Sequence, residues 1–122
     1  MPKVSSETAT TVQDFGVAID RSAELDGYTV DFVTITETHS LAPMLAGLPD
    51  GRCHCPHWGY LLAGRMTVHY ADHDEVVEPG DAFYMAPGHV PEAVEGTELV
   101  QISPTDEFQA TQDAIARAMQ AR

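Results

Sequence analysis

Cysteine is scarce in this sequence of 122 residues, which contains only Cys53 and Cys55. Two cysteines this close on one strand could form a disulfide only by distorting it, and so short a loop would add little stability. The pair therefore argues against a disulfide framework. We expect both thiols to be reduced.

Long apolar runs are also missing. No stretch approaches the roughly 20 residues that a membrane-spanning helix requires. Residues 1–7 lack the apolar core of a secretory signal. We therefore expect a cytoplasmic protein that does not insert into a membrane.

Basic residues are few, since 6 Lys and Arg stand against 19 Asp and Glu, and the formal net charge is −13. A field of this sign repels nucleic acid and anionic membrane surfaces, so neither is expected as a partner. The acidic excess identifies no ligand by itself. No nucleophile triad, phosphate-binding glycine loop or paired-carboxylate motif points to an enzyme class either.

The length suits a single domain, and an apolar fraction of 43% is typical of globular proteins. Residues 1–11 are polar and are expected to form a flexible N-terminal arm. Residues 12–103 contain short β-branched and aromatic runs separated by turn residues, without a helical stretch between them. This pattern predicts an all-β sandwich or small barrel. The predicted strands cover residues 12–20, 28–36, 53–62, 65–70, 76–77, 82–85 and 99–102.

Two finer expectations concern the first half of the chain. In the strand at 28–36, Val30 and Phe32 should face the core, while Thr29 and Asp31 should face solvent. Residues 37–51 are interrupted by Pro and Gly and predict a long connection, of the kind that often forms a lid or rim. Its apolar residues should pack over another part of the protein: Leu41, Met44, Leu45 and Leu48.

The pattern changes to a helical period in residues 104–122. Thr105 is a suitable N-cap, and the acidic residues that follow it complement the helix dipole. Phe108, Ile115 and Met119 form a narrow apolar stripe. The sequence predicts one C-terminal α-helix that lies on the barrel or on a second subunit.

The most informative segment starts at Cys53. If residues 53–62 form a strand, Cys53, Cys55 and His57 point the same way, because side chains alternate between faces. Thiols and imidazoles on one face suit a transition metal. The alternative is a pair of buried, inert cysteines beside a structural histidine. His89, which follows Pro87 and Gly88, is a fourth candidate ligand.

Gly64, then Gly80 and Asp81, and then Pro87-Gly88-His89 form a pattern that resembles the two-motif layout of the cupin superfamily. The resemblance covers roughly residues 28–103. It implies an antiparallel jelly-roll β-barrel over residues 12–103, with a metal inside and, commonly, three histidines and a glutamate as ligands.

The ligand positions depart from the common cupin set. Counting back from Gly64, the glutamate position is His57, the second histidine is Cys53, and the first is Gly51, which has no ligand atom. Pro91 stands at the histidine position of the second motif. His89 lies two residues earlier, on the same face of a strand.

The candidate metal ligands are therefore Cys53, His57 and His89, with Cys55 as a fourth ligand or a neighbour. This set is similar to that of a small cupin subgroup that includes the zinc-binding cupin domains of anti-sigma factors of the ChrR type. Their regulatory role is not implied, because these 122 residues contain no helical sigma-binding domain. Thiolate and imidazole favour zinc, and iron(II) is the alternative because many cupins use it.

Two function classes stay open. Three ligands would leave a free position for a small-molecule ligand, as in a metal-dependent enzyme acting on a small, partly hydrophobic metabolite. Four ligands including Cys55 would close the site, as in a non-catalytic binding or sensing module. Trp58 should point outward, and together with the apolar helix stripe it predicts a homodimer. The residues expected to line the barrel are Met66, Tyr70, Phe83 and Met85, or the residues that alternate with them along the strands.

Overall fold

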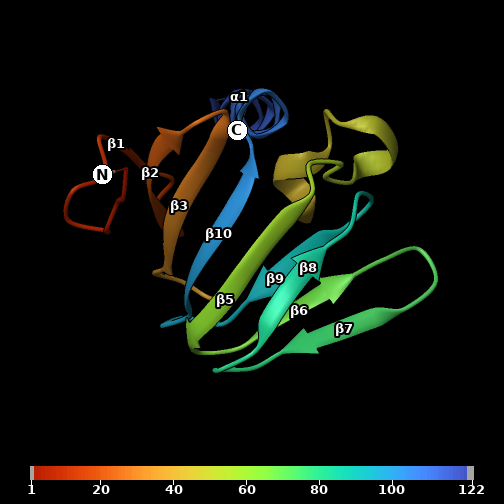
Figure 1. The fold of residues 1–122 in the computed structure, drawn as a ribbon. Helices are drawn as coiled ribbons and strands as arrows, with labels where there is room; N and C mark the ends of the chain where they lie inside the picture. The colour runs from red at the N-terminus through yellow and green to blue at the C-terminus, as the bar shows by residue number, and fades with distance from the viewer. Residues whose placement is uncertain (1, 121–122) are drawn as a thin grey trace.

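A computed structural model of the protein, which describes residues 2–120, consists of two antiparallel β-sheets and a C-terminal helix (Figure 1). The six-stranded sheet has the order β1 (Thr11–Asp14), β2 (Ala18–Leu25), β3 (Tyr28–Ile35), β10 (Glu98–Pro104), β5 (His57–Ala63) and β8 (Ala82–Met85). The four-stranded sheet has the order β4 (His39–Ser40), β9 (Val90–Ala93), β6 (Met66–His69) and β7 (Asp74–Val77). The predicted all-β jelly-roll with one C-terminal helix is confirmed.

The N-terminal strand expected at 12–20 is two strands. β1 ends at Asp14, whose carboxylate accepts a hydrogen bond from the N–H of Gly16, and Gly16 adopts a φ of +83°. Glycine reaches this left-handed conformation without a Cβ clash, so the chain can reverse here into β2. β2 and β3 then join at Asp26 and Gly27, which both have positive φ, as a tight hairpin turn requires.

The predicted orientation of β3 is wrong. Asp31 is fully buried and Thr29 is almost so, while Val30 and Phe32 lie on the outer face and are half-buried. The prediction assumed that the apolar set of a strand faces the core. Here the two polar side chains of β3 turn inward because each has a hydrogen-bond partner on another element: Asp31 accepts from Gln101, and Thr29 shares a hydrogen bond with Thr105.

The main core lies between the two sheets. It draws apolar side chains from eight strands of both sheets, among them Ile35, Leu61, Met66, Val68 and Leu99. Tyr70 and Phe83 pack against this cluster without being fully buried. The core therefore joins the two sheets into one unit around their shared interior.

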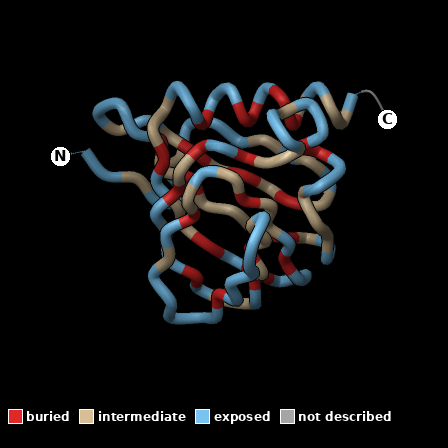
Figure 2. The backbone as a smooth tube through the Cα atoms, turned by 90° about the vertical axis from the view of Figure 1, so that its right-hand side faces the viewer, coloured by how far each residue is buried: buried red, intermediate tan, exposed pale blue. Residues whose placement is uncertain are grey.

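A second apolar cluster lies under the C-terminal helix α1 (Thr105–Gln120). Its stripe of Phe108 and Ile115 packs on Met44 and Leu45 of the short 3₁₀ helix η1 (Ala42–Leu45), which is followed by η2 (Pro49–Gly51). Figure 2 shows the buried parts of α1 facing the strands. The predicted packing of the 37–51 connection is confirmed. The last two residues of the helix predicted at 104–122 lie outside the described residues.

No helix among residues 2–120 is long and apolar enough to span a membrane.

Candidate metal centre

A short backbone bridge brings Cys53 next to His89. The N–H of Cys53 donates to the carbonyl of His89 over 2.9 Å, and the N–H of His89 donates back over 3.1 Å. Gly88 also donates to the carbonyl of Cys53, and its φ of +96° suits a residue without a Cβ. Reciprocal bonds of this kind fix two residues directly opposite each other. They set the two candidate ligands side by side.

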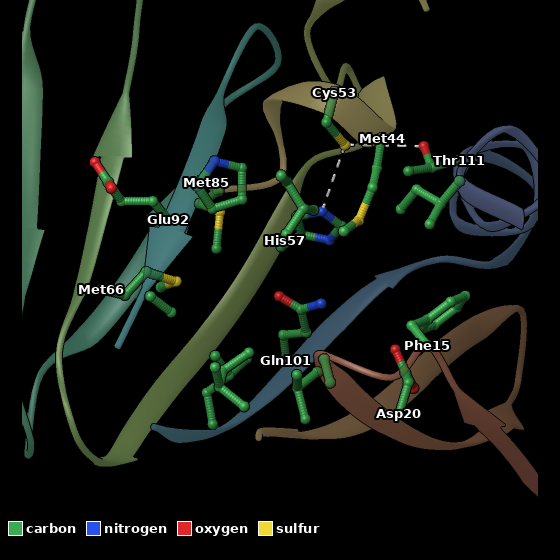
Figure 3. A pocket seen from close by; sticks show the side chains of 18 of the residues that line it. Phe15, Asp20, Met44, Cys53, His57, Met66, Met85, Glu92, Gln101 and Thr111 are labelled. Carbon is green, nitrogen blue, oxygen red and sulfur yellow. Dashed lines mark hydrogen bonds between the residues drawn. The ribbon is translucent and has the colours of Figure 1, made fainter. Parts of the chain in front are cut away.

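His57 is the first residue of β5, so the strand predicted from Cys53 is wrong at its start. Residues 54–56 are irregular, and Pro56 has no N–H to give to a strand ladder. Cys53 and His57 therefore meet through a bend in the chain and not through the alternation of a strand. The Sγ atom of Cys53 lies 3.8 Å from Nε2 of His57 (Figure 3).

Cys53, His57 and His89 are all buried, and each offers one ligand atom within 4.8 Å of the others. In a tetrahedral zinc site, bond lengths of about 2.3 Å to sulfur and 2.1 Å to nitrogen put sulfur and nitrogen roughly 3.5 Å apart. The observed distance of 3.8 Å between Cys53 Sγ and His57 Nε2 is close to this value. The three side chains are thus arranged to converge on one ion.

In both His57 and His89, a hydrogen bond at Nδ1 orients the imidazole ring. Nδ1 of His89 donates to the carbonyl of Ala86 over 2.6 Å, and Nδ1 of His57 shares a 2.6 Å hydrogen bond with Oγ of Ser103. When Nδ1 carries the proton, Nε2 presents its lone pair to a metal. Ser103 is fully buried on β10 and holds the His57 ring in place.

Burial keeps both histidines neutral and both cysteines protonated in the absence of a metal. Burial is the main reason that the pKa of His57 is lowered to about 3, and it also lowers the pKa of His89. Burial raises the pKa of Cys53 and, with help from the neighbouring Cys53, raises that of Cys55 to about 12. A metal that binds Cys53 must therefore displace its proton.

Cys55 lies outside the converging set. Its Sγ atom is 4.0 Å from Nδ1 of His57, whereas Cys53 faces Nε2, the other nitrogen of the ring. It is also close to the carbonyl of Pro56, at 3.6 Å. Within residues 2–120, the group that could hold a metal is Cys53, His57 and His89, with Cys55 as a neighbour of the His57 ring.

The three side chains line one part of a cavity of about 120 Å³ between the sheets and α1. Most of its wall is apolar and includes Phe15, Met44, Met66, Met85 and Leu99. Met66 and Met85 therefore have the predicted lining role. Sequence reasoning did not identify four polar residues that line the same cavity, because they come from three elements far apart in the sequence: Asp20 of β2, Gln101 of β10, and Thr111 and Gln112 of α1.

Solved structures with a similar arrangement include one described as a cupin. An RmlC-like cupin from Shewanella frigidimarina NCIMB 400 is 16% identical, with 85% of this chain and 92% of that chain covered and a TM-score of 0.58. The polyketide cyclase RemF from Streptomyces resistomycificus is also 16% identical, with 85% and 79% covered and a TM-score of 0.61. KdgF from Halomonas sp. is 19% identical, with 77% and 87% covered and a TM-score of 0.54.

The chain has the cupin fold. No family model matches the sequence, and none of the curated proteins matches it. At identities below 20%, the likeness to these structures establishes the fold and leaves the chemistry to be argued from the site. The similarity to ChrR-type cupin domains stays a prediction.

The cupin fold explains why the ligand candidates come from these segments. His57 at the start of β5 lies at the glutamate position of the first motif, and His89, just before β9, lies two residues before the histidine position of the second. Gly51, at the position of the first motif histidine, belongs to η2 and offers no ligand atom. Neutral imidazoles with free Nε2 atoms and a thiol on one cavity wall fit a metal with a preference for nitrogen and sulfur.

Proposed function

We propose that this cupin is a small metal-dependent enzyme that acts on a small, partly hydrophobic metabolite in its cavity. The observation that carries the proposal is the convergence of Cys53, His57 and His89 within 4.8 Å on the wall of an apolar cavity. Three protein ligands leave a coordination position free for a small molecule, which is the arrangement of catalytic zinc sites. A cavity of about 120 Å³ suits a ligand of the size of a benzene ring, since an engineered cavity of about 150 Å³ binds benzene.

Zinc is the proposed metal, with iron(II) as the alternative. A thiolate is a better partner for zinc than for a metal that prefers carboxylates, and the site contains no carboxylate ligand among residues 2–120. We also propose a cytoplasmic location, where both thiols stay reduced. When bound, zinc would supply Lewis-acid polarisation of a carbonyl or hydroxyl oxygen of the metabolite.

The chain itself performs the remaining tasks. Ser103 and the carbonyl of Ala86 hold the two imidazoles in their orientations. The apolar wall orients the ligand and excludes water, which strengthens polar interactions inside the cavity. Leu41 and Met44, from the connection before β5, and Phe108 of α1 close the side of the cavity under the helix.

Metal-free protein should bind one equivalent of zinc, more tightly than iron(II) or manganese(II), in a competition titration. X-ray absorption at the zinc edge should then find one sulfur and two imidazole nitrogens, with lighter donors completing the shell. Two sulfurs would show that Cys55 closes the site and would favour the non-catalytic binding or sensing module. Failure to bind any of the three metals would refute the proposed function.

We propose, in addition, that the protein is a homodimer that associates through the outer face of the six-stranded sheet. Trp58 is 49% exposed there, and its ring packs on Tyr84 at a centroid distance of 4.8 Å. Other exposed apolar residues on this face are Tyr28, Tyr60, Leu62 and Ile102. In a chain with a charge of −13, a face with so few acidic groups is where a second copy meets the least repulsion.

Trp58→Asp should convert the dimer into a monomer, because it puts a charge at the centre of the apolar face. Sedimentation at micromolar concentration provides the measurement. Val76→Asp is the matched control, since Val76 is similarly exposed but lies on β7 of the other sheet. A monomeric parent protein, or equal dissociation in both variants, would contradict the proposal.

A further inference from the structure

Four polar side chains form two hydrogen-bonded pairs on the inner face of the six-stranded sheet. Nε2 of Gln101 on β10 donates to Oδ2 of Asp31 on β3 over 3.1 Å. Nε2 of Gln112 on α1 donates to Oδ2 of Asp20 on β2 over 3.3 Å. Asp20 pairs with Val33, and Asp31 with Ser22, so the two acids are diagonal neighbours on one face. The bond between Gln112 and Asp20 links the helix to the sheet beside the cavity.

These two hydrogen bonds leave three buried oxygens of the four side chains without a partner. Among the described residues, Oδ1 of Asp20, Oδ1 of Asp31 and Oε1 of Gln112 have no hydrogen-bond partner. A proton held between the two carboxyl groups accounts for the two acid oxygens. Oε1 of Gln112 has no such explanation, although the residue is only 7% exposed. Buried acceptors are rarely left unpaired, because the loss of their hydrogen bonds with water is not compensated.

The protonation of the acids supports this arrangement. Burial, followed by the nearby charge of Asp20, raises the pKa of Asp31 well above its ordinary value. Burial also raises the pKa of Asp20. Two carboxyl groups in contact do not readily carry two charges, and sharing one proton relieves the repulsion.

Asp20, Gln101 and Gln112 line the same cavity as the three metal-ligand candidates. In Figure 3, Gln101 lies between Asp20 and His57. The wall of the cavity thus carries a cluster of soft ligands and a cluster of hydrogen-bonding groups. A molecule that spans the two clusters would need a different chemical group at each end.

We propose that Gln112, which donates to Asp20, forms a second binding subsite that accepts a hydrogen bond from a hydroxyl or amino group of a small, otherwise apolar ligand. The inference rests on the proposed function and deepens it, because it assigns the ligand a hydrogen-bond donor in addition to the group that meets the metal. Gln112 lines the cavity and uses Nε2 for its hydrogen bond to Asp20, so Oε1 is the atom left for the ligand. Thr111, the other polar helix residue lining the cavity, lies 3.8 Å from the sulfur of Cys53 and serves the metal end.

The test compares phenol with toluene, two molecules of the same shape that differ in one hydrogen-bond donor. Binding is measured by NMR titration of protein freed of metal, so that the metal makes no contribution. Phenol should bind more tightly than toluene by a factor on the order of ten, as one hydrogen bond to a buried, unpaired acceptor provides. Gln112→Met keeps the length of the side chain and removes the acceptor, so the preference should disappear.

Gln109→Met is the matched control, because Gln109 is an exposed glutamine one turn earlier on α1. It should retain the full preference for phenol. If Gln112→Met does not fold, Gln112→Ala gives the same comparison with a side chain that favours helix. Equal binding of the two probes by the parent protein, or a preference that survives loss of Gln112, overturns the subsite. Failure of both probes to bind also overturns it.

The outcome separates the subsite from the proposed function. A protein that prefers phenol but binds no metal retains the subsite and loses the enzyme proposal. A protein that binds zinc but does not distinguish phenol from toluene retains the metal centre and loses the subsite.

Discussion

His57→Ala and His89→Ala are each expected to reduce zinc content from one equivalent to nearly none. Removing one of three ligands deletes a coordinate bond and leaves the other two unable to hold the ion at ordinary concentrations. A loss of at least about two orders of magnitude in zinc affinity is expected, because even mutation of outer-shell partners costs 10–100-fold. Metal analysis after dialysis against a weak chelator provides the measurement.

His54→Ala is the matched control for this pair. His54 lies in the same segment, but its ring is exposed and bonds the carbonyl of Pro49. Its replacement should leave one equivalent of zinc. Full zinc content in both His57→Ala and His89→Ala would show that these side chains do not form the metal site.

Substitution of Cys53 and substitution of Cys55 should have different effects on zinc content in the same assay. Cys53→Ser removes the soft ligand that faces Nε2 of His57 and should empty the site. Cys55→Ser changes a thiol on the Nδ1 side of the ring and should retain most of the metal. Equal losses would favour a closed, structural site and weaken the enzyme proposal.

The cluster of Cys53, His57 and His89 could be predicted from sequence because its chemistry is unusual, while their role as metal ligands stays a prediction. Few segments of a chain concentrate thiols and imidazoles, and the turn residues around Gly64 and Pro87-Gly88 bring His57 and His89 to corresponding strand starts. The expected continuous strand from Cys53 to His57 is wrong, since the two residues meet through an irregular bend. A bridge to His89, which no local pattern encodes, fixes Cys53 in place.

The buried polar groups beside the cavity could not be predicted in the same way. Alternation predicts that Asp31 faces solvent, because a charged residue in an alternating strand usually points outward. Its burial depends on Asp20, Gln101 and Gln112, which lie on three other elements. Their mutual contacts arise only when the sheet and helix assemble, so no short stretch of sequence carries the signal. The C-terminal helix itself was readily predicted, but that it would complete the cavity was not.

Gly64→Ala is expected to cause the largest loss of folding stability among single-methyl substitutions at turns. Gly64 has a φ of +84°, and a Cβ added there would lie 2.3 Å from Oγ1 and 2.4 Å from Cα of Thr97. Thr97 cannot move aside easily. It is fully buried, and its hydroxyl both accepts from the N–H and donates to the carbonyl of Arg65. The same glycine therefore makes the turn between β5 and β6 and allows the chain before β10 to approach it closely.

Gly27→Ala separates backbone strain from the steric clash, because Gly27 has the same φ of +84° but no atom within 4 Å of an added Cβ. Its loss should reflect backbone strain alone, about 1–2 kcal/mol. Gly64→Ala adds a steric clash with buried backbone, and we expect a total loss above about 4 kcal/mol, a size reached only by severe packing or backbone defects. Urea unfolding of both variants gives the comparison. Similar losses would mean that Thr97 yields without cost and that the close packing of this turn does not stabilise the fold.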